Sequence, residues 1–207
     1  STKIENSTLA SQLAPKVWLL RGELQQSIGD PSMTIESMRQ VLALYPWAEE
    51  LIQSEIASAQ AQVGNVDETV KAYRAAASKA TTDVARASWL EQSARANSSG
   101  SRHSDAIADL DAILSFAKQP DYRADLQYRV GQLYATAGNE ASAIERWFLA
   151  TKEAADSQSA YLALVELINR EVPFDPYLRA KIDLQAEAWF PAINAYQIFL
   201  ESVPISD

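Results

Sequence analysis

Cysteine is absent from these 207 residues, and histidine occurs only once, at His103. This scarcity excludes thiol nucleophiles, thiolate zinc sites and disulfide frameworks. It also leaves His103 without a second residue for metal binding or catalysis, so we expect a surface or helix-capping residue there. An absence of cysteine fits a protein outside the cytoplasm, and we favour the cell envelope over the cytoplasm.

Positive charge is also scarce: 18 lysines and arginines stand against 27 aspartates and glutamates, a net charge of −9. Binding of nucleic acid requires a basic face that neutralises phosphates, so we expect no nucleic-acid partner. The same deficit disfavours docking on anionic lipid. No run of 18 apolar residues is present, which predicts that the chain has no membrane span.

Catalytic motifs are missing too. The sequence has no Gly-x-Ser-x-Gly elbow and no glycine-rich phosphate loop that ends in Lys-Ser/Thr. Carboxylates are plentiful, for example Asp105, Asp109 and Asp111. At this spacing we expect them on a solvated helix face. We therefore predict no active site, no metal and no cofactor.

The glycines, only six in number, are spaced regularly. Gly29, Gly64, Gly100 and Gly138 recur at intervals of 35, 36 and 38 residues, and each follows a stretch of helix-forming residues. The two others, Gly22 and Gly131, each lie seven residues before one of them. A period of this length is typical of a solenoid, in which each repeat buries its apolar face against its neighbours.

Apolar residues recur at three- and four-residue spacing almost throughout, which predicts an all-α fold of antiparallel helix pairs. We expect a polar linker over 1–13 and a single helical solenoid over 14–207. Pro15 fits the first turn of its helix. The eleven predicted helices span 14–28, 31–44, 47–63, 66–79, 83–97, 103–117, 121–137, 140–154, 158–170, 175–188 and 191–202.

The repeats resemble tetratricopeptide repeats (TPRs). The first and fourth carry that family's pattern most fully, the second more weakly; the third needs about one inserted residue in its turn, and the last pair lacks the turn glycine. The residues that carry the resemblance are Trp18, Gly22, Gly29, Thr34, Met38, Val41 and Pro46; Ala57, Gly64, Thr69, Tyr73 and Ala76; Trp89, Gly100, Ala106 and Leu110; Gln127, Gly131, Tyr134, Gly138, Ala143, Trp147 and Ala150; and Ala192, Tyr196, Phe199 and Pro204.

The resemblance implies an α-α superhelix. In it, the first helix of each pair lines a concave groove. Trp18, Trp89 and Trp147 occupy core positions, whereas Trp47 and Trp189 lie beside helix junctions and are the more exposed. We expect Gly131 to allow close approach to the partner helix near Ala143. The groove-facing candidates are Lys16, Glu23 and Gln26 in the first repeat, Ser54, Ser58 and Gln62 in the second, and Tyr128, Gln132 and Thr136 in the fourth.

The C-terminal third is similar to the helical region that precedes the catalytic domain of some bacterial soluble lytic transglycosylases. The residues that carry this similarity span 159–167, 172–175, 192–196 and 199–204. Where that family often has Arg-Gly and a tyrosine-rich helix, this chain has Arg179, Ala180 and Lys181. The catalytic domain with its glutamate has no counterpart in the chain. The resemblance therefore implies at most a non-catalytic part of a cell-wall enzyme.

Two functions from different classes follow. The first is a non-catalytic scaffold that holds a protein or peptide in its groove. The alternative is the helical region of a lytic transglycosylase, with peptidoglycan or cell-wall proteins as partners. A helical enzyme in its own right is a weaker third interpretation, because the polar residues form no recognisable constellation.

Overall fold

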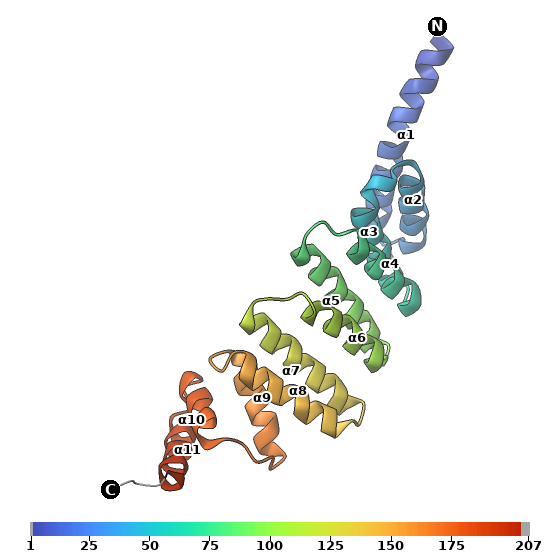
Figure 1. Ribbon diagram of the computed structural model, residues 1–207. Helices are drawn as coiled ribbons and strands as arrows, with labels where there is room; N and C mark the ends of the chain where they lie inside the picture. The colour runs from blue at the N-terminus through green and yellow to red at the C-terminus, as the bar shows by residue number, and fades with distance from the viewer. Residues whose placement is uncertain (1, 204–207) are drawn as a thin grey trace. The chain divides into compact units, whose positions relative to one another are not determined.

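The computed structural model describes the backbone of residues 2–203 and the side chains of residues 13–203. Eleven α-helices account for nearly all of this range, and no strand occurs within it, which confirms the all-α prediction (Figure 1). The helices are α1 (Thr2–Ser27), α2 (Pro31–Leu44), α3 (Glu49–Gln62), α4 (Val66–Lys79), α5 (Asp83–Ser99), α6 (His103–Leu114), α7 (Pro120–Thr136), α8 (Glu140–Glu153), α9 (Gln158–Asn169), α10 (Pro176–Gln185) and α11 (Trp189–Ser202). A 3₁₀ turn, η1, covers Pro46–Ala48.

The chain forms two compact units, Ser1–Asp109 and Leu110–Asp207, with the boundary inside α6. In the first unit, α1 packs on α2, α2 on α3, α3 on α4 and α4 on α5. In the second unit, α8 packs on both α7 and α9, α9 also touches α7 directly, and α10 packs on α11.

The first helix differs from its prediction. It begins at Thr2 and includes most of the stretch that we expected as a linker, and Pro15 lies inside the helix rather than in its first turn. No glycine or proline interrupts residues 1–14, and the polar residues there cost only fractions of a kcal/mol each in a helix. Apolar periodicity does not detect such a polar helical extension. The last predicted residue of the repeat pattern, Pro204, lies outside the described residues.

The turn glycines end their helices with a left-handed backbone, as the repeat pattern predicts. Their φ angles are +75° at Gly29, +74° at Gly64 and +78° at Gly138. After Gly64, the amide of Asn65 donates to the carbonyl of Gln60 (3.0 Å), the backbone pattern of a Schellman motif. The Asn65 side chain then accepts from the amide of Glu68 (3.3 Å) and caps the next helix. One Gly-Asn dipeptide thus ends one helix and starts another.

The third turn shows where the inserted residue goes. Gly100 has an ordinary φ of −84°, and the left-handed conformation falls on Ser101, at φ +58°. The amide of Arg102 closes the Schellman motif on the carbonyl of Asn97 (2.8 Å). The third turn therefore has the same Schellman geometry as the others, but its left-handed residue is Ser101. The Cβ of serine disfavours that backbone conformation.

We expect Ser101→Gly to stabilise the chain by about 1 kcal/mol, because glycine adopts the left-handed backbone without steric cost. The measurement is the midpoint of urea unfolding followed by circular dichroism. Ser99→Gly is the matched control, since Ser99 lies in the helix and loses helical propensity on the same change. If both variants were equally destabilised, backbone strain at Ser101 would be disproved.

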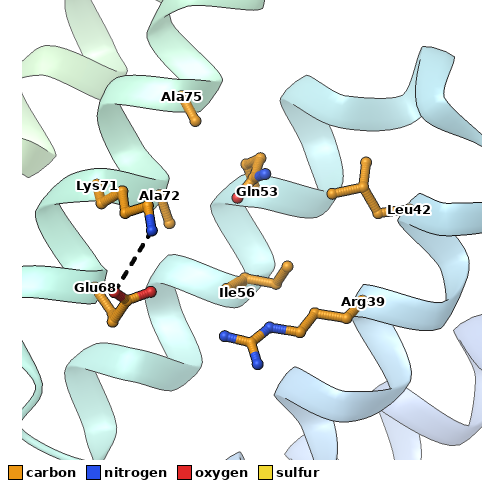
Figure 2. Close-up of a pocket in the computed structure, with 8 residues that line it drawn as sticks. All are labelled: Arg39, Leu42, Gln53, Ile56, Glu68, Lys71, Ala72 and Ala75. Atoms are coloured by element: carbon orange, nitrogen blue, oxygen red, sulfur yellow. Dashed lines mark ion pairs between the residues drawn. The ribbon is translucent and has the colours of Figure 1, made fainter.

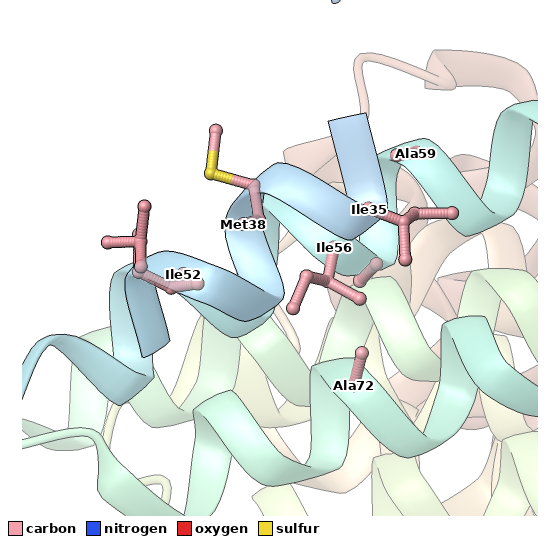
Figure 3. Close-up of a cluster of buried hydrophobic side chains, with 8 residues drawn as sticks. Ile35, Met38, Ile52, Ile56, Ala59 and Ala72 are labelled. Carbon is pink, nitrogen blue, oxygen red and sulfur yellow. The ribbon is translucent and has the colours of Figure 1, made fainter. Parts of the chain in front are cut away.

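The core of the first unit is built from aliphatic side chains and small residues. Ile35 and Met38 of α2 belong to one buried cluster with Ile52 and Ile56 of α3 and Ala72 of α4 (Figure 3). Alanines at the contacts permit close approach of the helix backbones, so a thin layer of side chains fills the interior. Trp18, on α1, packs against this cluster and is half-buried.

The tryptophans follow the prediction in part. Trp147 is fully buried at 0% exposure, among Ala143 and Ala150 of its own helix and residues of α9. Trp18 and Trp89 are only half-buried, so the prediction of a largely buried position is too strong for them. Trp47 and Trp189 are 81% and 56% exposed, in agreement with their place at helix junctions.

Candidate functional site

The predicted groove residues of the first two repeats lie on α1 and α3. Lys16 and Glu23 are exposed on α1, Gln26 is half-buried, Ser58 is half-buried on α3, and Gln62 is exposed near its end. The accessible members of this set carry one positive charge, one negative charge and two amides. They offer hydrogen bonds to a ligand rather than a reaction centre.

Ser54 differs from its prediction as a groove residue. Its side chain is only 7% exposed, and its hydroxyl donates to the carbonyl of Leu51 one turn earlier (2.7 Å). A helical serine commonly satisfies its hydroxyl in this way when it has no other partner. Ser54 is therefore a packing residue, and the adjacent exposed position on the helix is Leu51.

In the second unit, α9 provides partners for the predicted groove residues of α7. The amide Nε2 of Gln132 donates to Tyr128 Oη (2.7 Å) and to Glu166 Oε1 on α9 (2.8 Å). Thr136 is exposed, and its hydroxyl donates to the Gln132 carbonyl (2.8 Å). Two of the predicted groove residues, Tyr128 and Gln132, thus lie together, but the Tyr128 hydroxyl and the Gln132 amide group are already bonded within the unit.

Glu166 and Arg170 complete this cluster and were not among the sequence candidates. Arg170 Nη1 pairs with Glu166 Oε2, and Arg170 Nε pairs with Glu140 on α8. The guanidinium carbon of Arg170 lies 4.4 Å from the centre of the Trp147 ring. The cluster therefore links α7, α8 and α9 through ion pairs, a hydrogen bond and a ring contact. The sequence did contain a signal for the Glu166–Arg170 ion pair, since the two residues are four apart on one predicted helix.

A small cavity of about 220 Å³ opens between α2, α3 and α4. Arg39 reaches its mouth from α2, opposite Glu68 and Lys71 of α4, whose carboxylate and amine are 3.7 Å apart (Figure 2). The exposed Lys71–Glu68 pair is of the kind that contributes less than about 1 kcal/mol. The remaining lining consists of Leu42, Gln53, Ile56, Ala72 and Ala75.

A second cavity, of about 250 Å³, is bordered by η1, the first turn of α3 and Trp89 of α5. We call it the aromatic pocket; Trp47, Ala48, Glu50, Leu51 and Trp89 line it. The indole Nε1 of Trp89 donates to Glu50 Oε1 (3.1 Å). The pocket therefore combines two indole rings with a carboxylate whose position is fixed by one of them.

Tyr73 of α4 packs against Trp89, one of the residues that line this pocket. Its ring stacks on that of Trp89, with centroids 6.3 Å apart and planes inclined by 15°. Burial raises the pKa of the Tyr73 hydroxyl, and the negative charge of Glu55 raises it further. Tyr73 is therefore a neutral packing residue at physiological pH, and it holds the Trp89 ring in place.

The described part of the chain offers neither a metal site nor a membrane span. Within residues 13–203, no group of three or more histidines, cysteines, aspartates and glutamates is placed to hold a metal ion. None of the described helices is both long enough and apolar enough to cross a bilayer. His103 is the first residue of α6 and is half-buried.

Comparison with solved structures places the fold. A crystal structure of a MamA protein matches 95% of this chain and 100% of its own chain, with a TM-score of 0.55 and 15% sequence identity. A tetratricopeptide repeat protein from Parabacteroides merdae ATCC 43184 matches over 92% of this chain and 81% of its own, with a TM-score of 0.52 and 18% identity. At these identities the likeness shows the fold alone. The chain has a TPR-like helical-repeat fold.

No family model matches the sequence. No curated protein matches it either. The similarity of the C-terminal third to lytic transglycosylases therefore finds no support in these comparisons, and the assignment of the repeats to the TPR type rests on the structure.

Proposed function

We propose that the chain is a non-catalytic scaffold that binds protein or peptide partners along the predicted concave face. The observation that carries the proposal is the TPR-like arrangement of helix pairs, because stacked pairs of this kind present extended surfaces to a ligand. The polar, accessible residues Lys16, Glu23 and Gln62 on α1 and α3 fit a ligand with a hydrogen-bonding backbone. The internally paired carboxylates fit a stabilising role rather than a catalytic one.

Site-specific photo-crosslinking tests this proposal. A photoreactive amino acid replaces Gln62 on the predicted groove face, and in a matched variant it replaces Lys71, which is exposed on α4. We expect ultraviolet light to give discrete, protease-sensitive adducts from position 62 in cells of the source organism and few from position 71. Mass spectrometry identifies the partner peptide, and a synthetic copy of that peptide should then compete for the adduct.

Adducts in equal amounts from both positions would indicate random collision and contradict a specific groove. Adducts from position 71 alone would contradict the proposed groove and indicate a binding surface that includes α4. Protease-resistant adducts that a muramidase removes would point to peptidoglycan in place of a protein.

A further inference from the structure

The aromatic pocket has the composition of a site for a cationic side chain. Trp47 is 81% exposed, and its ring is tilted against that of Tyr45 at a centroid distance of 5.4 Å. A large exposed indole costs free energy in water unless something covers it. Trp89 is half-buried at the same pocket, so two indole rings of different exposure border one space of about 250 Å³.

The carboxylate of Glu50 determines the sign of charge that the pocket accepts. Glu50 accepts its hydrogen bond from the indole of Trp89, a neutral donor that brings no opposing charge. The neighbouring Glu49 differs, because Lys79 lies 3.1 Å from its carboxylate and offsets its charge. A carboxylate with one oxygen held by an indole keeps further acceptor sites for a ligand. An anionic ligand is repelled here, whereas a cation gains both the carboxylate and the ring faces.

Arginine fits these features better than lysine does. Its planar guanidinium stacks on an indole face while its N–H groups donate to a carboxylate, and its aliphatic stem covers apolar surface such as Leu51. The net charge of −9 of the whole chain adds long-range attraction for a basic ligand.

We propose that the aromatic pocket binds an arginine side chain of a partner polypeptide, clamped between Trp47, Trp89 and Glu50. This rests on the proposed scaffold function and adds the chemistry of one contact to it. Leu51 belongs to the pocket, and its helical spacing to Ser58 and Gln62 places it on the same side of α3 as these predicted groove residues, which links the arginine to the rest of a bound peptide. The partner is therefore a basic segment rather than an acidic one.

Nuclear magnetic resonance titration of the ¹⁵N-labelled full chain tests the pocket directly. The probe is Nα-acetyl-arginine amide, and the matched neutral probe is Nα-acetyl-citrulline amide, which has nearly the same shape without the charge. We expect saturable shifts of the indole N–H signals of Trp47 and Trp89 with the arginine probe. We expect the citrulline probe to bind at least about tenfold more weakly, since it lacks the charge-assisted contact.

Paired variants separate the pocket from general electrostatics. Glu50→Gln keeps an acceptor for the Trp89 indole, and it should weaken arginine binding about tenfold. Glu49→Gln makes the same charge change one residue away, and affinity should stay within about twofold. Trp47→Ala should abolish the shift of Trp89, whereas Trp189→Ala, at another exposed indole, should leave it unchanged.

Shifts that do not saturate, or equal binding of both probes, would overturn the proposal even if Glu50→Gln failed to fold. Equal loss of affinity in Glu49→Gln and Glu50→Gln would show that binding depends only on net charge. That result would also overturn the proposal. Saturable shifts with tri-N-acetylchitotriose but none with arginine would make this a sugar site. In each case the photo-crosslinks from position 62 test the scaffold function separately. The proposal of an arginine site can therefore be disproved without disproving the scaffold function.

Discussion

Gly131→Ala should destabilise the chain by about 1–3 kcal/mol, although alanine is the better helix former. A Cβ added at Gly131 would lie 2.5 Å from Nε1 and 2.6 Å from Cδ1 of Trp147. The indole has little room to yield, because Trp147 is fully buried and the Arg170 guanidinium lies over its ring. The steric conflict therefore outweighs the gain of about 1 kcal/mol in backbone entropy. Urea unfolding followed by circular dichroism measures the difference.

Gly22→Ala is the matched control in the first unit. Gly22 precedes Met38 by the same 16 residues that separate Gly131 from Trp147, and a Cβ there would meet Met38 Cε at 2.7 Å. A methionine side chain can move its terminal methyl group, whereas an indole cannot. We expect Gly22→Ala to be neutral or to stabilise by up to about 1 kcal/mol.

Exchange of the partner residue completes this test. In a Trp147→Met background, which copies the pairing of the first unit, Gly131→Ala should lose its destabilising effect, a coupling of about 1–3 kcal/mol. Equal effects of Gly131→Ala in both backgrounds would show that the glycine is needed for another reason. The close approach predicted from the sequence is present, but its partner is Trp147, one turn beyond the expected Ala143, because the long indole reaches back along α8.

The helices and their turns could be predicted because both depend on local chemistry. Periodic apolar residues set the eleven helices, and glycine marked three left-handed turns at Gly29, Gly64 and Gly138. The left-handed backbone of Ser101 could not be predicted in this way, since it is set by the geometry of the turn and not by the residue type. The same holds at Glu171 and Glu187, with φ angles of +55° and +58°.

The surface could be predicted only in part, because it depends on contacts between distant residues. The exposure of Trp47 followed from its place at a junction, but its pocket also requires Trp89, 42 residues later. Gln132 was predicted to face a groove, and the packing of α9 on α7 supplied Glu166 as its partner. Helical periodicity says which side of a helix is apolar, not which polar side chain it meets.

Asp109 is buried, in contrast to the solvated position that the sequence predicts. We expected Asp105, Asp109 and Asp111 on a solvated face, yet Asp109 is only 4% exposed. A sign was present in the sequence: Ala106, Asp109, Leu110 and Ile113 share the i, i+3, i+4, i+7 spacing of one helix face, and the other three are buried. Asp111 is partly exposed and pairs with Arg146 at 2.9 Å.

The buried carboxylate of Asp109 joins three helices of the first unit. Its Oδ1 accepts from Arg74 Nε on α4 (2.8 Å), and its Oδ2 accepts from Ser93 Oγ (2.7 Å) and Asn97 Nδ2 (2.9 Å) on α5. Three donors therefore converge on one side chain, two of them on buried residues. Removal of the acceptor would leave the donors of Ser93 and Asn97 without a partner where water reaches poorly, whereas Arg74 is exposed and can bond to water.

Asp109→Ala should therefore cost about 2–4 kcal/mol of unfolding free energy, because the two buried donors on Ser93 and Asn97 lose their acceptor at about 1–3 kcal/mol each. Asp105→Ala is the control: Asp105 is exposed in the first turn of the same helix, and its loss should cost only a few tenths of a kcal/mol through the helix dipole. Asp109→Asn should fall between the two, because its amide oxygen still accepts while its NH₂ group faces a donor. Urea unfolding of the three variants gives the order directly. If Asp109→Ala were no more harmful than Asp105→Ala, the carboxylate would not join the helices. The acidic face expected from the sequence would then be the better description of α6.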